Sequence, residues 1–295
     1  MSQPIIGFIG FGEAAYLISE GLKSEGVTDI YAFDVNTNHP TLGSVILKRA
    51  NKLQVHLTTT INGIFEKCQY IFCATSAKVA ESIAKEVKHF IKENQYYIDL
   101  NAASPMVKEK IADYISESGA KFVDAAVMDS VPLKRHKVPI FLSGTGAEDF
   151  ENIGNQMGMN LTFINEKPGA SSAIKMFRSI FMKGFSALLI ETLQSSKKYG
   201  VSKLVMESLD ESITSRSLEE TANLLLPRTA IHAERRVAEM DEVIKTLQVL
   251  DIDSTISEAI KKKLKLLVDL KVKELLNNKV PDHYDELLLI IDENK

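Results

Sequence analysis

A glycine-rich turn directly after the first apolar run constrains the fold of this chain more than any other feature. The run over residues 4–10 (PIIGFIG) leads into GFGEAA at 10–15 and an amphipathic stretch over 14–26. In a G-x-G-x-x-A turn the first Gly makes a tight turn, the second lets backbone approach a pyrophosphate, and the Ala lets helix and strand pack closely. Amides at the start of the helix then face the phosphates. We therefore expect dinucleotide contacts from Gly10, Phe11, Gly12, Glu13 and Ala14.

The first half of the chain alternates strand-like and helix-like patterns. Its apolar runs cover residues 4–10, 29–35, 70–76, 95–101, 120–127 and 138–144. Amphipathic stretches separate several of these runs, for example at 14–26 and 77–94. Strands that alternate with helices are typical of βαβ units, and near-continuous apolar strands indicate helices on both faces of a sheet. The sequence predicts an α/β fold whose N-terminal domain is a doubly wound, mostly parallel Rossmann sheet.

After about residue 166 the pattern is helical, with no convincing strand. Helical stretches cover residues 169–200, 203–213, 217–225, 228–249, 254–277 and 282–292. The segment NEKPGA at 165–170 has the Pro and Gly that are typical of a hinge. We predict a dinucleotide-binding domain over residues 1–166 and an all-helical substrate and dimerisation domain over 167–295.

Composition excludes several classes of protein. The chain is 45% hydrophobic and 25% charged with a net charge of −4, which is ordinary for a globular protein and gives no overall basic field for nucleic acid. No apolar run approaches the roughly 20 residues of a membrane-spanning helix, and the N-terminus lacks the basic region of a signal peptide. Cys68 and Cys73 lie on or beside one strand, too far apart to bridge, which favours a reducing compartment. We expect a cytoplasmic protein that binds neither nucleic acid nor a membrane.

The end of the second apolar run bears on which dinucleotide binds. It holds Asp34, 24 residues after Gly10, near the position that hydrogen-bonds the adenosine ribose hydroxyls. A carboxylate there accepts from a 2′-hydroxyl and repels a 2′-phosphate, and no Arg follows closely. We predict NAD as the cofactor. NADP stays an alternative, since Ala15 at the third small position occurs with NADP in some enzymes.

A lysine near the start of the 169–200 stretch is the main candidate for chemistry. Lys175, Arg178 and Lys183 fall on one helical stripe, together with Ser179 and Met182. The surrounding residues are so apolar that we expect the helix to be buried on most sides, and buried cations need a partner. Cations without acids among them favour an anionic or carbonyl-bearing ligand. The alternative is a solvated edge along which the Lys and Arg stems lie on apolar surface.

Further cations lie in two other segments. Arg228, His232, Arg235, Arg236 and Glu239 follow Pro227 at spacings of three and four, which predicts one polar stripe on a helix that begins at the proline. The stripe either faces substrate or a second subunit, or consists of exposed pairs such as Arg235 with Glu239. The basic loop at 134–137 either meets an acid of the substrate or is simply solvated.

Four segments together resemble a known family. They are GFIGFGEAA near the N-terminus, DLNAASP at 99–105, DAAV at 124–127 and the Lys-Met at 175–176 after Gly169, in that order. The chain resembles the β-hydroxyacid dehydrogenases, relatives of 6-phosphogluconate dehydrogenase and 3-hydroxyisobutyrate dehydrogenase. Within that family it is most similar to a subgroup with a distinct helical C-terminal domain. The resemblance implies oxidation of a hydroxyacid with a nicotinamide cofactor, a homodimer, and Lys175 as the catalytic lysine.

The chain departs from that family at several substrate positions. Arg178 stands where the family usually has Asn, and Asn101-Ala102 stands where it usually has Ser-Thr. Met128-Asp129-Ser130 replaces a Ser-Gly-Gly loop. These departures remove groups that anchor a carboxylate, so the family's substrate specificity does not transfer.

We therefore interpret the chain as an NAD-dependent oxidoreductase with its site between the two domains. Hydride passes between the nicotinamide and the CH–OH or C=O carbon of a small, acidic substrate, and Lys175 exchanges the proton. The expected further cofactor contacts are Thr75, Ser76 and Asn101. The expected substrate contacts are Met128, Ser130, Arg178 and His232, and no metal is expected. The alternatives are an imine or ketone reductase on the same scaffold and a catalytically idle dinucleotide-binding protein.

Overall fold

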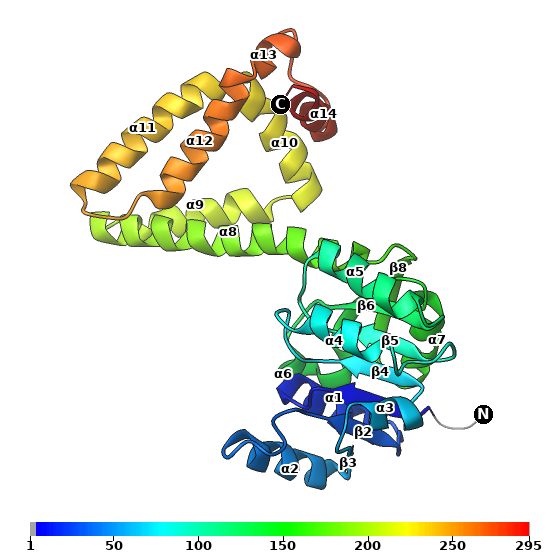
Figure 1. Cartoon of the computed structure of the whole chain (residues 1–295). Helices are drawn as coiled ribbons and strands as arrows, with labels where there is room; N and C mark the ends of the chain where they lie inside the picture. Colours follow the sequence, from blue (N-terminus) through cyan, green and yellow to red (C-terminus); the bar gives the residue numbers. More distant parts are fainter. Residues whose placement is uncertain (1–3, 295) are drawn as a thin grey trace. The chain divides into compact units, whose positions relative to one another are not determined.

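The computed structural model describes residues 4–294 of the chain (Figure 1). These residues form two compact units, which divide between Ile180 and Phe181. The division lies inside a long helix, α8 (Ala170–Tyr199), and not in the 165–170 segment where the sequence places the domain boundary. The reason is that the first turn of α8 is hydrogen-bonded to the first unit through Ser171 and Ser172.

The first unit is built on an eight-stranded sheet with the order β3-β2-β1-β4-β5-β6-β7-β8. The strands are β1 (Ile6–Ile9), β2 (Ile30–Phe33), β3 (His56–Leu57), β4 (Tyr70–Cys73), β5 (Tyr96–Asp99), β6 (Lys121–Val127), β7 (Pro139–Ser143) and β8 (Asn160–Asn165). All neighbours are parallel except β6 and β7, which pair antiparallel. The predicted doubly wound, mostly parallel sheet is confirmed.

Helices cover both faces of this sheet because successive strand residues point to opposite sides. The helices are α1 (Glu13–Ser24), α2 (Leu42–Leu53), α3 (Asn62–Lys67), α4 (Ala80–Val87), α5 (Pro105–Ser116), α6 (Val131–Lys134) and α7 (Ala147–Gln156), with a 3₁₀ turn at Arg135–Lys137. Phe8 of β1 packs in one core with residues of α1, α2 and α7. Its neighbour Ile9 packs in a second core with residues of α3, α4 and α5. The two cores hold in place the central strands, whose carboxyl ends carry the candidate site.

Two strands of the sheet escape the sequence patterns. β3 has only two residues, too few to show a period. In β8, buried Leu161 and half-buried Phe163 alternate with exposed polar residues. Because of these polar residues, the segment is not a continuous apolar run, and its sequence pattern does not identify it as a strand. The predicted helix over 77–94 is also too long, since α4 ends at Val87 and the chain continues in turns.

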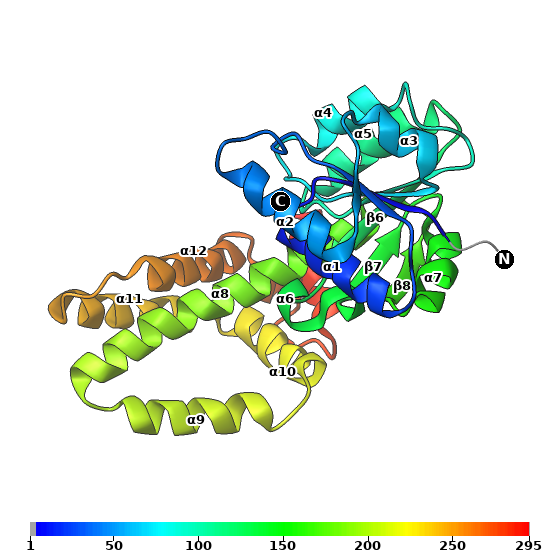
Figure 2. The ribbon, with the colours of Figure 1, turned by 90° about the horizontal axis from the view of Figure 1, so that it is seen from below.

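Every regular element of the second unit within residues 181–294 is a helix, as predicted. These helices are the C-terminal part of α8, α9 (Ser202–Thr214), α10 (Leu218–Ile231), α11 (Ala233–Val249), α12 (Thr255–Asp269), α13 (Val272–Leu275) and α14 (Tyr284–Glu293). α11 and α12 lie side by side in both views (Figures 1 and 2). The five helices from α10 to α14 share a small core, to which each contributes one residue: Ala230, Ala233, Leu267, Val272 and Leu287.

The expected helix start at Pro227 is wrong. Ser217 and Glu220 form a capping box that starts α10 at Leu218, and Pro227 lies inside that helix. The helical path breaks instead at His232, which ends α10 and precedes α11. Arg228 and Arg235 therefore lie on different helices, and the predicted single stripe does not exist. Arg235 forms an ion pair with Glu239, as the alternative interpretation of that segment has it.

The expectation that α8 is buried on most sides is also wrong for a single chain. Phe177 is 67% exposed, Ile180 72% and Ile190 61%. These side chains leave a long apolar surface without a partner in residues 4–294. Even so, no helix among those residues is both long and apolar enough to cross a bilayer.

Candidate functional site

The glycine turn between β1 and α1 has the geometry that its sequence predicts. Gly10 has a φ of +87°, and a Cβ there would lie 2.6 Å from the Ala74 carbonyl oxygen. A Cβ on Gly12 would instead meet nothing within 4 Å. No side chain of the described residues caps the first turn of α1. The turn thus offers open space and free helix amides at one place, which fits a bound pyrophosphate.

Two cavities meet beside this turn, at the carboxyl ends of the strands. One has a volume of about 670 Å³ and is lined by residues that include Gly12, Asp34 and Glu86. The other has a volume of about 310 Å³ and is lined by residues that include Ala14 and Asn101. Ala74, Thr75 and Ser76 line both. The strand order reverses between β1 and β4, the point at which open α/β sheets bind ligands.

Asp34 lies at the end of β2 and lines the larger cavity. Its Oδ2 accepts a hydrogen bond from the Phe11 N–H at 2.8 Å, and its Oδ1 accepts one from the Asn36 N–H at 2.8 Å. Each carboxylate oxygen keeps a lone pair, so Asp34 retains the capacity to accept from a ribose hydroxyl. Two backbone donors hold it in place for that role.

Two of the predicted cofactor residues have internal partners. The Phe11 ring is fully buried in the core, and its N–H is used by Asp34. The Asn101 amide donates to Asp99 Oδ1 at 2.6 Å and to the Cys73 carbonyl oxygen at 3.3 Å, and it accepts from the Thr75 N–H at 2.9 Å. Asn101 thus fixes the Thr75 backbone at the rim of both cavities, which favours a supporting role over direct contact with a ligand.

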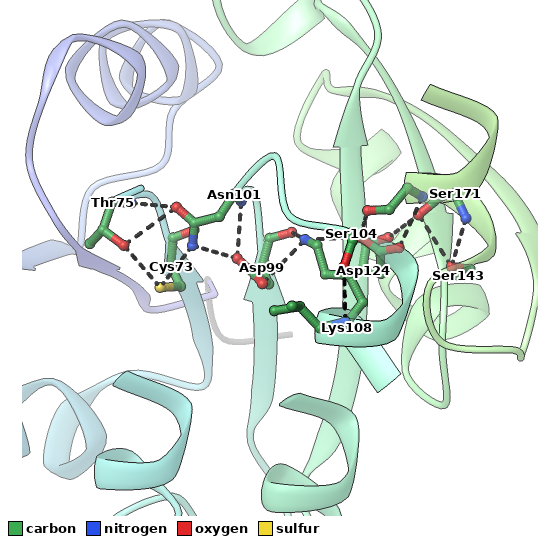
Figure 3. A network of polar contacts seen from close by, with 11 residues as sticks. Cys73, Thr75, Asp99, Asn101, Ser104, Lys108, Asp124, Ser143 and Ser171 are labelled. Atoms are coloured by element: carbon green, nitrogen blue, oxygen red, sulfur yellow. Dashed lines mark hydrogen bonds and ion pairs between the residues drawn. The ribbon is translucent and has the colours of Figure 1, made fainter. Parts of the chain in front are cut away.

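Next to Asn101 lies a fully buried group of three charges (Figure 3). Lys108 Nζ, in α5, lies 3.2 Å from Asp99 Oδ2 and 3.0 Å from Asp124 Oδ1. It also donates to the Asp99 carbonyl oxygen at 2.9 Å. Burial by itself lowers the pKa of Lys108, but the two carboxylates outweigh it and raise that pKa above its usual value. We call Asp99, Lys108 and Asp124 the ion triad.

The ion triad connects directly to the first turn of α8. Asp124 Oδ2 accepts from the Ser172 N–H at 3.0 Å, and Asp124 Oδ1 accepts from the Ser172 hydroxyl at 2.8 Å. The Ser171 hydroxyl donates to the Asp124 carbonyl oxygen at 2.8 Å, and the Ser171 N–H donates to Ser143 Oγ at 3.0 Å. A carboxylate at a helix N-terminus is favoured by the helix dipole. These contacts hold the backbone that carries Lys175, one turn further along.

Lys175 is half-buried beside the ion triad. Burial is the largest cause that lowers its pKa, the charge of Lys108 lowers it further, and the charge of Asp124 opposes both. Within residues 4–294 its amine has no hydrogen-bond or ion-pair partner. A partly desolvated, unpaired amine is suited to gain and lose a proton closer to neutral pH than an ordinary lysine.

The predicted substrate residues do not all lie in one unit. Met128 and Ser130 lie in the loop between β6 and α6, with Asp129 paired to Lys134 at 2.7 Å. Hydrogen bonds from Lys134 and the Ser130 N–H lower the pKa of Asp129, and the nearby charge of exposed Arg178 adds to the effect. His232 is exposed in the second unit, between α10 and α11.

The residue that sequence reasoning missed is Lys108. In α5 it shares a helical face with Ile111, Ala112 and Ile115, all buried. A cation at spacings of three, four and seven from apolar residues is a detectable signal of a buried charge. Its partner Asp99 lies near the end of the apolar run at 95–101 and its partner Asp124 lies inside the run at 120–127, where a buried acid requires a counter-charge.

Neither metal ligands nor reactive thiols accompany this site. No group of three or more His, Cys, Asp or Glu side chains that could hold a metal ion occurs in residues 4–294. Cys68 and Cys73 are free and buried, as expected. Burial raises the pKa of Cys68 to about 12 and that of Cys73 to about 11, so both thiols stay protonated.

Comparison with known proteins places the two units in described families. Residues 5–163 match the NAD binding domain of 6-phosphogluconate dehydrogenase. Residues 197–267 match a domain of unknown function, DUF1932.

The solved structures that are similar to the chain include the following three. A conserved hypothetical protein from Sinorhizobium meliloti is 30% identical with a TM-score of 0.64, over 99% of this chain and 97% of that one. A conserved protein of unknown function, described as structurally similar to 3-hydroxyacid dehydrogenases, is 32% identical with a TM-score of 0.62, over 90% and 96%. An imine reductase from Myxococcus stipitatus in complex with NADP⁺ has a TM-score of 0.71 over 90% and 94%, and at 15% identity shows a shared fold alone. The match over residues 5–163 includes the glycine turn and both cavities, and the chain therefore belongs to the family of the NAD binding domain of 6-phosphogluconate dehydrogenase.

Proposed function

We propose that this protein is an NAD-dependent oxidoreductase that interconverts the CH–OH and C=O groups of a small, acidic substrate, with Lys175 as the general acid and base. The observation that carries the proposal is the half-buried Lys175 amine, which has no partner within residues 4–294 and lies next to Lys108 and Asp124. Because its pKa is lowered, a larger fraction of this amine is uncharged near neutral pH than for an exposed lysine. A proton exchanger of this kind is what oxidation of an alcohol needs.

The preference for NAD over NADP is supported by the charge of the larger cavity. Its lining includes the acids Asp34 and Glu86, and none of its lining residues is Lys or Arg. A 2′-phosphate would therefore meet negative charge without a compensating cation. An NADP⁺-bound relative at 15% identity shares the fold but carries no information on this choice.

The residues present fit a dinucleotide, which when bound supplies or accepts the hydride. Gly12 and the first-turn amides of α1 would hold its pyrophosphate, and Asp34 its adenosine ribose. Lys175 in its neutral form takes the proton from a substrate hydroxyl during oxidation, and in its charged form returns the proton to the carbonyl oxygen during reduction. Exposed Arg178 and Lys134 offer positive charge to an acidic group of the substrate.

A second candidate is reduction of an imine or of a ketone that lacks an acidic group. Taken alone, the carboxylate of Asp129, at the position of the family's Ser-Gly-Gly loop, favours this alternative because it repels a substrate carboxylate. However, Asp129 is paired with Lys134 and lies near Arg178. The net charge of the three side chains is +1, so the group as a whole favours the acidic substrate.

We also propose that two copies of the chain associate through α8. The exposed side chains of Phe177, Ile180, Phe181 and Ile190 form an apolar surface of the kind that protein interfaces cover. The resemblance to β-hydroxyacid dehydrogenases, which are usually dimers, favours a second copy as the occupant.

The experiment that tests the function is turnover with a substrate panel. Purified protein is assayed with NAD, NADP and their reduced forms against hydroxyacids, polyol acids, their keto forms, and cyclic imines. We expect turnover with NAD and one class of hydroxyacid. Turnover of imines alone would favour the second candidate. Binding of NADH without turnover of any substrate would favour the idle dinucleotide-binding protein.

A further inference from the structure

A buried chain of contacts runs from the rim of the cavities to Lys108 (Figure 3). The Thr75 N–H donates to Asn101 Oδ1 at 2.9 Å. The Asn101 N–H and side-chain amide both donate to Asp99 Oδ1, at 3.0 Å and 2.6 Å. The other oxygen of Asp99 lies 3.2 Å from Lys108 Nζ. Lys108 therefore fixes the carboxylate on which Asn101 depends.

The same lysine holds the start of α8 from the other side. Asp124 pairs with Lys108 Nζ through Oδ1, the oxygen that also accepts the Ser172 hydroxyl. Gly169, just before α8, has a φ of +86°, and a Cβ there would lie 2.8 Å from the carbonyl oxygen of Pro105, the first residue of α5. The first turns of α5 and α8 are thus packed together around the ion triad.

Stability alone does not account for three buried charges. Removing charged groups from water is costly, and an apolar group of similar volume is often as stable as a buried ion pair. In some proteins buried ionic groups instead fix one geometry among several. Asp99, Lys108 and Asp124 are all fully buried and none of them lines either cavity. They act on a ligand only through the residues they hold.

We propose that Lys108 is a positioning residue for Lys175, because it holds the first turn of α8 through Asp124 and Ser172 and places a fixed positive charge near the Lys175 amine. The charged side chains that act on Lys175 from neighbouring elements are Lys108 of α5 and Asp124 of β6. Arg178 follows it on α8 itself. The proposal rests on the proposed function only for the use made of the Lys175 proton.

The first test titrates the amines of the wild-type protein without any turnover. Trace labelling with acetic anhydride at a series of pH values, followed by peptide mass spectrometry, gives the protonation midpoint of each lysine. We expect Lys175 to label with a midpoint below that of exposed Lys183, and Lys108 to stay unlabelled until the protein unfolds. A Lys175 midpoint equal to or above that of Lys183 would overturn the proposal.

The second test removes the Lys108 charge without leaving an extra buried acid. Lys108→Met combined with Asp99→Asn keeps the net charge of the ion triad at −1 and leaves Asp124 on α8. We expect the Lys175 midpoint to rise by about one pH unit, which lowers its labelling rate at pH 8 about tenfold. Lys110→Met, an exposed change two residues further along α5, is the control and leaves Lys175 labelling unchanged.

These tests separate the positioning role from the proposed function. A folded double variant with an unchanged Lys175 midpoint would show that Lys108 is a structural ion and nothing more. If the double variant does not fold, the wild-type titration is the test: a Lys175 midpoint below that of Lys183 supports the proposal, and one equal to or above it overturns the proposal. If labelling behaves as expected but a Lys175→Met variant keeps full turnover, the proposed function fails and the positioning of Lys175 stands.

Discussion

Gly12→Ala is expected to weaken dinucleotide binding without affecting the fold. Gly12 has a φ of −72° and a ψ of −161°, a conformation open to alanine, and the added Cβ meets nothing within 4 Å. Alanine lowers the entropy of the unfolded chain, which raises the free energy of unfolding by about 0.4–1 kcal/mol. Alanine is also a poorer residue than glycine directly before a helix, which lowers the free energy of unfolding by about 0.5 kcal/mol. The net change in the free energy of unfolding is therefore under about 1 kcal/mol, and the change in Tm under about 4 °C.

The new methyl group occupies the space through which a pyrophosphate approaches the backbone. We expect the Kd for NADH to rise at least about tenfold, or about 1.4 kcal/mol, in a fluorescence titration. Gly10→Ala is the matched comparison, because its φ of +87° and the 2.6 Å approach to the Ala74 oxygen make alanine strained. That variant is expected to lose roughly 1–3 kcal/mol of stability, and its Tm to fall by roughly 2–12 °C. Wild-type NADH affinity in a folded Gly12→Ala variant would refute a pyrophosphate site at this turn.

Three further outcomes follow from the site and its surroundings. NADH is expected to bind more tightly than NADPH in direct titration, because the cavity is lined by Asp34 and Glu86 and by no cation that could balance a 2′-phosphate. Equal affinities would show that these acids do not discriminate between the two cofactors. Light scattering is expected to give about twice the chain mass of 32.8 kDa, and Phe177→Glu to shift the mass towards one chain; a wild-type monomer at micromolar concentration would exclude the α8 interface. Burial lowers the pKa of His136 below its ordinary 6.5, while a hydrogen bond to Glu25 opposes this. The unfolded chain therefore takes up this proton first, and stability is full above pH 6.5 and declines as the pH falls below it. The free energy of unfolding from urea titrations at pH 8 and pH 5.5 checks this, with a smaller decline in His136→Gln than in wild type; equal declines would contradict it.

Features written in local sequence were predictable, and features made by distant contacts were not. Gly10 and Gly12 were recognisable from their spacing after an apolar run: Gly10 has a φ of +87° that favours glycine, and Gly12 leaves open space beside the backbone. The apolar runs that become β1, β2 and β4–β7 are likewise local. The start of α10 is an exception, because the capping box of Ser217 and Glu220 is also a local pattern, and it starts the helix at Leu218 so that Pro227 falls inside it.

The candidate site divides in the same way. Lys175 was identifiable as a cation in an apolar helix. The ion triad was not, because Asp99, Lys108 and Asp124 meet only when β5, α5 and β6 pack together. The exposure of α8 was missed for a different reason, since an apolar composition favours a covered surface but does not identify whether the same chain covers it.

The central claim is that Lys175 performs the proton transfer and does not maintain the fold. Lys175→Met keeps most of the aliphatic volume and removes the amine, so packing changes little. On whichever substrate the wild type turns over, the variant is expected to lose roughly two to four orders of magnitude in kcat, the usual range for a lost general acid or base. Its NADH affinity and Tm are expected to match the parent, since the proposed dinucleotide contacts, Gly12 and Asp34, lie outside α8, the helix that carries Lys175. Near-normal kcat in a folded Lys175→Met protein would contradict the account.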